Sequence, residues 1–162
     1  MTHQRYPVPC PHGALSMMAC PPAAGRQQRI GDLAAQGVTH VVSLLSPDET
    51  RALHMADMPG ICTDLHMQHW WFPIADYAVP QMADFKVFIM RISTALQAGA
   101  SVVIHCRAGV GRSGLTAACT LVALGQTPDA ARQIVSKARG MPTPETPAQV
   151  SFISGFAENL RH

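Results

Sequence analysis

Residues 101–114 read Ser-Val-Val-Ile-His-Cys-Arg-Ala-Gly-Val-Gly-Arg-Ser-Gly, and they carry the strongest indication of the fold. Its first five residues form a short apolar run, which is typical of a central parallel strand. The glycine-bearing segment after it predicts a tight turn, followed by a helix of small apolar residues from Gly114 to Leu124. Ligands of α/β sheets collect beyond the carboxyl ends of the strands, so this turn is the predicted ligand site.

Helices and strands alternate on both sides of this stretch. The spacing of apolar residues and the Gly and Pro signals predict helices over residues 26–36, 46–57, 81–97, 127–140 and from 146 onward. Ser46-Pro47-Asp48-Glu49 supplies an N-cap for the second of these, and Gly60 closes it. Further strands are predicted over residues 38–45 and 61–72. The alternation predicts an α/β fold with a largely parallel central sheet flanked by helices.

The chain of 162 residues has the size of one domain, and we expect a single domain over residues 1–162. Seven Pro and Gly residues interrupt the first 25 positions, which predicts an irregular N-terminal segment with one short strand around residues 14–19. No internal repeat or interdomain linker is visible.

Composition excludes several classes of function. Charged residues make up 14% of the chain, the net charge is +2, and no basic run would follow a nucleic-acid backbone, so we expect no nucleic-acid partner. The five cysteines include no Cys-x-x-Cys pair, which favours reduced thiols. No stretch approaches the roughly 18 apolar residues of a spanning helix, and the first residues contain no secretory signal. We therefore expect a cytoplasmic monomer without a membrane span.

The turn itself carries residues suited to phosphate chemistry. Five residues separate Cys106 from Arg112, two of them glycine, so backbone N–H groups can curl around one anion. The predicted phosphate-binding residues are Arg107, Ala108, Gly109, Val110, Gly111 and Arg112. The positive end of the following helix favours a thiolate, so we expect Cys106 to be an ionised nucleophile at neutral pH. The Arg112 guanidinium can bind two phosphoryl oxygens, and Ser113 can donate a hydrogen bond to the sulfur.

The pattern His-Cys-x5-Arg-Ser resembles the signature of the protein tyrosine and dual-specificity phosphatase superfamily. Together with Phe72-Pro-Ile-Ala-Asp76, it looks most like the kinase-associated phosphatase branch. The resemblance implies that Asp76 is the general acid and, in the second step, the base. It also implies that residues 145–149, Glu-Thr-Pro-Ala-Gln, correspond to the glutamine loop that orients the attacking water. Because Glu replaces the usual Gln at the first position, only Gln149 is assigned that role.

Other residues admit less specific interpretations. Asp76 could be an ordinary turn residue, in which case Asp64 and Asp84 are the fallback acids. His105 is interpreted as a supporting residue that orders the loop, because an ionised thiol needs no base. Cys62, His66 and His69 suggest a zinc site, but their spacing on the strand predicted there separates the side chains, so we expect no metal. The remaining cysteines are expected to pack in the core.

These features predict a protein phosphatase that works through a phosphocysteine intermediate and needs no cofactor. The expected substrate is a phosphoprotein or a small phosphomonoester. No clear phosphotyrosine-recognition segment is visible near the N-terminus, so a shallow dual-specificity pocket is favoured over a strictly tyrosine-specific one. Phosphotyrosine is expected, and phosphoserine, phosphothreonine and phosphoinositides stay open. Activity should have a bell-shaped pH profile, since Cys106 must be ionised while Asp76 is protonated. Two alternatives remain: a rhodanese-type sulfurtransferase and a non-catalytic phosphate-binding module.

Overall fold

A five-stranded sheet forms the centre of the protein, with the strands in the order β1-β2-β5-β3-β4. The computed structural model describes residues 4–162. Its parallel strands are β2 (Ala14–Met18), β5 (Ser101–His105), β3 (His40–Ser43) and β4 (Gln68–Trp71). The edge strand β1 (Arg5–Val8) pairs antiparallel with β2. The predicted α/β class with a largely parallel sheet is confirmed.

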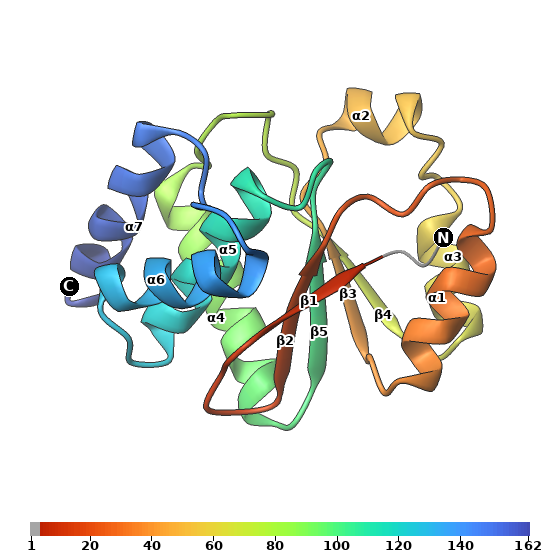
Figure 1. Cartoon of the computed structure of the whole chain (residues 1–162), viewed down its shortest axis with the longest axis horizontal. Helices are drawn as coiled ribbons and strands as arrows, with labels where there is room; N and C mark the ends of the chain where they lie inside the picture. The colour runs from red at the N-terminus through yellow and green to blue at the C-terminus, as the bar shows by residue number, and fades with distance from the viewer. Residues whose placement is uncertain (1–3) are drawn as a thin grey trace.

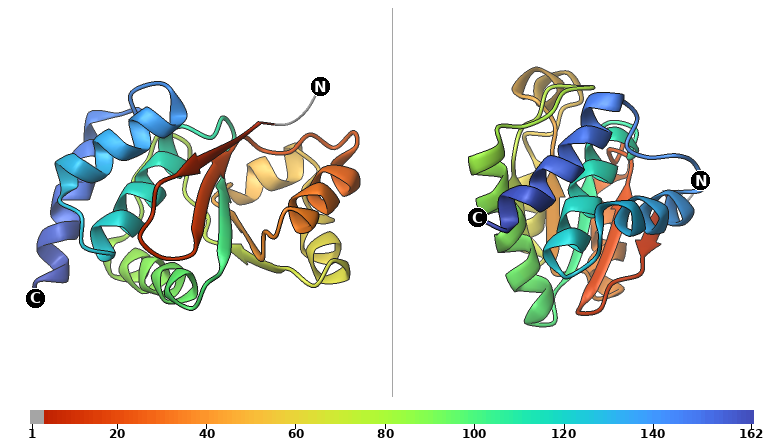
Figure 2. Two further views of the ribbon diagram at one scale, coloured as in Figure 1. Left: turned by 60° about the horizontal axis from the view of Figure 1, so that its bottom comes forward. Right: turned by 90° about the vertical axis from the view of Figure 1, so that its left-hand side faces the viewer.

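Helices cover both faces of the sheet (Figure 1). One face carries α1 (Arg26–Ala35) and α3 (Met58–Asp64), while α2 (Pro47–Ala52) follows the carboxyl end of β3. The other face carries α4, α5, α6 and α7, which span Met82–Gln97, Gly111–Ala123, Pro128–Arg139 and Pro147–Leu160. Figure 2 shows α5 enclosed between the sheet and the outer helices of this layer. Each face of the sheet therefore has its own apolar core.

The helix after β5 starts earlier than the sequence predicts. It begins at Gly111 and not at Gly114, because the Gly114 N–H already donates a helical hydrogen bond to the Val110 carbonyl at 2.9 Å. All of its residues up to Val122 are buried, as its small apolar composition predicts. The earlier start places Arg112 and Ser113 on the first turn, next to the end of β5.

The predicted strand over residues 61–72 is wrong for its first half. Met58–Asp64 form α3, and only Gln68–Trp71 form β4. Met58 and Cys62 share one helical face and are fully buried against the core under α1. The preceding helix correspondingly ends at Ala52 and not near Asp57, and the glycine that was expected to close it lies inside α3. A short apolar run fits both the period of a helix and the period of a strand, so the sequence pattern does not distinguish the two structures. The helix forms here because it buries Met58 and Cys62.

The N-terminal segment contains two strands where one was predicted. Ala14–Met18 confirms the expected strand, and Arg5–Val8 adds β1, paired from Arg5 opposite Met18 to Val8 opposite Leu15. Pro7 argues against a strand in the sequence, but a sheet edge tolerates a residue without an N–H. The part of the prediction that falls on residues 1–3 lies outside the described residues.

Helix starts follow the predicted capping chemistry. Ser46 and Glu49 form a capping box on α2, Thr127 caps α6, and Thr146 and Gln149 form a second box on α7. None of the helices within residues 4–162 has the length and apolar character needed to cross a membrane.

Candidate active site

The turn between β5 and α5 forms a cradle, which we define as residues 106–112. It lies at the carboxyl end of the central strand β5, between β2 and β3. Gly109 has φ +74°, and a Cβ atom there would lie 2.6 Å from the Met18 carbonyl group, so only glycine fits this turn. Cys106 is 2% exposed at the start of the cradle. The sequence-based prediction of a tight strand-to-helix turn is confirmed.

Ser113 contacts the sulfur of Cys106 directly. Its hydroxyl donates a hydrogen bond to Sγ over 3.0 Å, and both side chains are buried. A donor aimed at sulfur stabilises negative charge on it. The geometry therefore suits a sulfur atom that carries charge as a nucleophile or as a leaving group.

His105 is fully buried at the last position of β5. Its Nδ1 lies 3.2 Å from the carbonyl oxygen of Cys106, so the imidazole packs against the backbone at the start of the cradle. This placement is compatible with the predicted supporting role.

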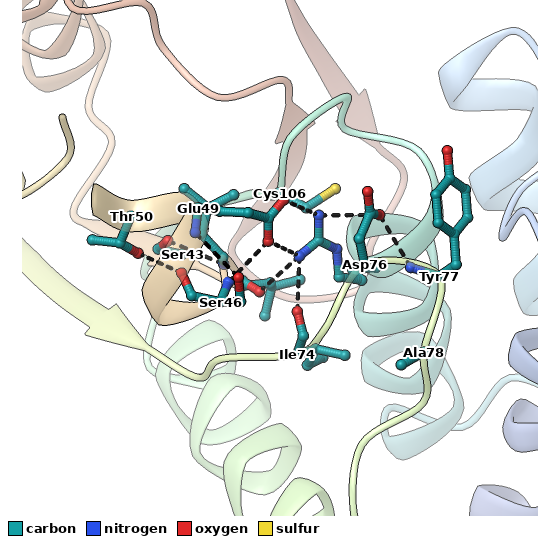
Figure 3. A network of polar contacts seen from close by, with 12 residues as sticks. Ser43, Ser46, Glu49, Thr50, Ile74, Asp76, Tyr77, Ala78 and Cys106 are labelled. Atoms are coloured by element: carbon teal, nitrogen blue, oxygen red, sulfur yellow. Dashed lines mark hydrogen bonds and ion pairs between the residues drawn. The ribbon is translucent and has the colours of Figure 1, made fainter. Parts of the chain in front are cut away.

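Arg112 is 1% exposed and is held by several acceptors. Nη1 and Nη2 donate to the two carboxylate oxygens of Glu49 over 2.6 and 2.9 Å, and Nη1 also donates to the Ile74 carbonyl over 2.8 Å. Nη2 lies 3.2 Å from Asp76 Oδ1. Figure 3 shows the Glu49 and Asp76 carboxylates approaching the guanidinium from opposite sides. Nε takes no part in these bonds.

Glu49 is a site residue that the sequence analysis missed. Its Oε1 accepts a hydrogen bond from the Ser46 N–H over 3.0 Å, which completes the capping box of α2, and the same carboxylate binds Arg112. The hydrogen bond from Arg112 lowers the pKa of Glu49 to about 2, against the opposing effect of burial. The capping pattern was visible in the sequence, but nothing local pointed to a partner 63 positions away.

Asp76 lies on the loop between β4 and α4, beside Arg112. Its side chain is 41% exposed, and Oδ1 also accepts a hydrogen bond from the Tyr77 N–H over 3.0 Å. The loop is fixed to the site on both sides, since Arg112 binds the Ile74 carbonyl and Gln149 Nε2 donates to the Ala78 carbonyl over 3.2 Å. The structure therefore brings the predicted acid to the cradle.

Gln149 is fully buried behind the cradle, on the first turn of α7. Its Oε1 accepts hydrogen bonds from the backbone N–H groups of Glu145 and Thr146 over 3.1 and 3.2 Å. A Cβ atom on Gly111 would lie 3.3 Å from Gln149 Oε1 and only 2.7 Å from Glu145 Oε1. The loop that carries Glu145 and Gln149 thus packs directly on the cradle.

One arginine belongs to the cradle and another reaches it from α6. Arg107 is exposed at its surface. Arg139, at the end of α6, donates to the carbonyl oxygens of Gly109 and Ala108 over 3.0 and 3.3 Å and stacks over the Tyr6 ring at 4.1 Å. Arg139 was not predicted, because a side chain that binds backbone carbonyls leaves no sequence motif.

The other candidates lie away from the cradle. Asp64 ends α3, and Asp84 is in the first turn of α4. Burial raises the pKa of Cys62 to about 11, which disfavours a thiolate there. Cys62 lies on α3 and not on the strand predicted for it, and His66 lies in the turn that follows. No group of three or more potential metal ligands occurs among residues 4–162.

A buried thiol at the end of a parallel strand, a glycine-rich cradle and an arginine on the next helical turn together define the fold class of the cysteine-dependent phosphatases. Comparison with known protein families supports the same class. The family described as "Swiss Army Knife protein, DSP-PTPase phosphatase domain" matches residues 12–152. The chain belongs to this family.

Individual relatives point to the same class. Cyclin-dependent kinase inhibitor 3 of Homo sapiens is 33% identical over 103 residues, which are 62% of this chain and 46% of that protein. The chain thus matches about half the length of this curated relative. A crystal structure of kinase associated phosphatase, with its catalytic-site cysteine replaced by serine, has a TM-score of 0.89 at 21% identity, over 99% of this chain and 97% of that one.

PTPMT1 in complex with PI(5)P has a similar fold. Its TM-score is 0.76 at 19% identity, over 91% of this chain and 92% of that one. The predicted resemblance to the phosphatase superfamily and to its kinase-associated branch is confirmed by these matches.

Proposed function

We propose that this protein is a phosphatase that transfers the phosphoryl group of a phosphoprotein to Cys106 and then to water. The observation that carries the proposal is the contact of Ser113 with Cys106 Sγ, next to the buried Arg112. The sulfur nucleophile lies at the end of β5, and the donor that stabilises it and the guanidinium for phosphate lie on the first turn of α5. No cofactor is needed for this chemistry.

In the first step, Cys106 Sγ attacks phosphorus and the bond from phosphorus to the substrate oxygen breaks. Asp76 gives its proton to that oxygen, so the alcohol leaves as a neutral molecule. Backbone N–H groups of residues 107–112 and the Nε edge of Arg112 hold the phosphoryl oxygens. A bound phosphate competes with Asp76 for Nη2 of Arg112, which frees the carboxyl group to meet the leaving oxygen.

The second step hydrolyses the phosphocysteine. Water attacks phosphorus, the bond between phosphorus and sulfur breaks, and Ser113 stabilises the departing thiolate. A carboxylate must take the proton of the water. Apart from Glu49, which Arg112 holds through both oxygens, the carboxylates of Asp76 and Glu145 lie next to the cradle.

Phosphotyrosine is the proposed main substrate. The Tyr77 side chain is 61% exposed and directly follows Asp76, so its ring can stack on an aromatic phosphoester at the mouth of the site. The names cyclin-dependent kinase inhibitor 3 and kinase associated phosphatase, given to matched relatives, refer to protein kinases. These names favour a phosphoprotein substrate over a small phosphate. Phosphoserine and phosphothreonine are the next candidates.

The test is a panel of phosphotyrosine peptide, phosphothreonine peptide and PI(5)P, with wild type and Cys106→Ser. We expect phosphate release from the phosphotyrosine peptide to be fastest, and the serine variant to fall to background on every substrate. Activity that survives in Cys106→Ser would overturn the proposal. Sulfur transfer from thiosulfate to cyanide without phosphate release would favour the sulfurtransferase alternative, and phosphate binding without turnover would favour the binding module.

A further inference from the structure

The carboxylate of Glu145 lies at the edge of the cradle and accepts none of the hydrogen bonds described above. Its Oε1 lies 2.7 Å from the position that a Cβ atom on Gly111 would occupy, so the carboxylate lies against the cradle backbone. The residue is exposed to solvent. Within residues 4–162, the hydrogen bonds of Glu145 outside the helices involve its backbone N–H and not its carboxylate. Its lone pairs are therefore available to a water molecule at the site.

Gln149, in contrast, has no acceptor left for water. An amide oxygen has two lone pairs, and Gln149 Oε1 already accepts from the backbone N–H groups of Glu145 and Thr146. Its Nε2 is bound to the Ala78 carbonyl on the Asp76 loop. Gln149 therefore acts as a positioning residue, which fixes the backbone of Glu145 and ties it to the acid loop.

Asp76 is already bound by other groups. Its Oδ1 accepts from the Tyr77 N–H and lies 3.2 Å from Arg112 Nη2. Two donors therefore already occupy Oδ1 of Asp76. Glu49 and Asp76 are both held by Arg112. Of the three carboxylates at the cradle, Glu145 is thus the one whose carboxylate has no such partner within residues 4–162.

We infer that Glu145 is the general base that activates water for hydrolysis of the phosphocysteine, an inference that rests on the proposed phosphatase function. The water oxygen forms a bond to phosphorus while one water proton passes to the Glu145 carboxylate. The bond between phosphorus and sulfur breaks, and its electron pair returns to Cys106 Sγ. Inorganic phosphate leaves, and the exposed Glu145 returns its proton to solvent. Asp76 then serves the first step alone.

Glu145→Gln tests the assignment, since it keeps the shape of the side chain and removes its basicity. With p-nitrophenyl phosphate and rapid acid quenching, we expect kcat to fall about a hundredfold and phosphocysteine to accumulate after a burst of p-nitrophenol. The value of kcat/KM should change less than about threefold, because it reports only the steps up to formation of the intermediate. Glu158→Gln, an exposed change on α7, is the matched control and should behave as wild type.

Asp76→Asn separates the two carboxylates. Phosphocysteine formed by this variant should hydrolyse at the wild-type rate, whereas that formed by Glu145→Gln should persist. The inference is overturned if Glu145→Gln turns over like wild type, if its burst is slowed without accumulation, or if Asp76→Asn slows hydrolysis of the intermediate to the same extent. A wild-type enzyme that forms no phosphocysteine and releases no phosphate would instead overturn the proposed function.

Discussion

The candidate site has a floor and a rim that differ in burial. The floor consists of Cys106, Arg112, Ser113 and Glu49; the first three of these are at most 2% exposed, and the Glu49 side chain is 11% exposed. The rim consists of Asp76 and Glu145, with Asp76 41% exposed. In the proposed mechanism the floor residues bind phosphate, or hold the groups that bind it, from positions inside the core, so their substitution should change stability as well as activity. The rim residues are proposed to transfer protons at the surface, so their substitution should change activity alone.

Arg112→Lys should have the largest effect among these tests. Lysine cannot bind Glu49 and phosphate through one planar group, so we expect kcat/KM to fall about a thousandfold. The loss of the bidentate ion pair with Glu49 should also lower the melting temperature. Steady-state kinetics and thermal unfolding measure both effects. Arg51→Lys, whose side chain is 72% exposed, is the control and should change neither. Wild-type activity in the Arg112→Lys variant would contradict the assignment of Arg112 as the phosphate clamp.

Asp76→Asn probes the rim. We expect kcat/KM to fall about a hundredfold for an alkyl phosphate, whose leaving oxygen needs a proton, and much less for p-nitrophenyl phosphate. The melting temperature should stay near that of wild type, because the side chain is exposed. Equal losses on both substrates would argue against an acid at this position, and a marked loss of stability would break the distinction between floor and rim.

Glu49→Gln tests whether a residue that need not touch substrate belongs to the floor. The variant leaves Arg112 buried without its charged partner, which should lower the free energy of unfolding by about 3 kcal/mol. Because Arg112 is then less well fixed, kcat/KM should also fall, by roughly tenfold. Chemical denaturation and steady-state kinetics measure the two quantities. A stable variant with reduced activity would place Glu49 with the rim.

The ion pair between Glu49 and Arg112 predicts that the stability of the protein depends on pH. The pKa of Glu49 in the folded protein is about 2, below its ordinary value of 4.5, so folding favours the ionised carboxylate. Its contribution should be fully present above about pH 5 and should disappear as the pH falls toward 2. The difference in melting temperature between wild type and Glu49→Gln should shrink accordingly. A difference that stays constant from pH 7 to the acid limit of folding would contradict the ion pair.

Ser113→Ala should have the smallest effect. It removes one hydrogen bond to Cys106 Sγ, an interaction worth about 1 kcal/mol, so kcat should fall roughly fivefold while kcat/KM changes less. Rapid-quench measurements should find a modest accumulation of phosphocysteine. Ser113→Cys or Ser113→Thr, which keep a donor at this position, should recover part of the rate. An unchanged kcat in the alanine variant would show that the donor does not assist the leaving sulfur.

The cradle could be predicted because its determinants are local. A β-branched run, two glycines and the Cys–Arg spacing all lie within residues 101–114, and the strand, the tight turn and the fully buried helix follow from them. The N-cap at Ser46 and the helix starts at Thr127 and Thr146 were predicted for the same reason, since capping acts over three positions.

The remaining features depend on contacts between distant parts of the chain. Glu49 binds Arg112 across 63 positions, and only the fold brings them together. Residues 58–64 form a helix because that period buries Met58 and Cys62 against α1, which a short apolar run does not reveal. The strand at Arg5–Val8 exists because β2 offers an edge that accepts Pro7.

The most direct test of the account is to locate the phosphoryl group during turnover. Wild-type protein is mixed with phosphotyrosine peptide, quenched in acid within the first turnover, digested, and analysed by mass spectrometry. We predict one phosphoryl group on the peptide that contains Cys106, increased in amount in Glu145→Gln and absent in Cys106→Ser. Phosphate release without any phosphorylation of Cys106 would contradict the account.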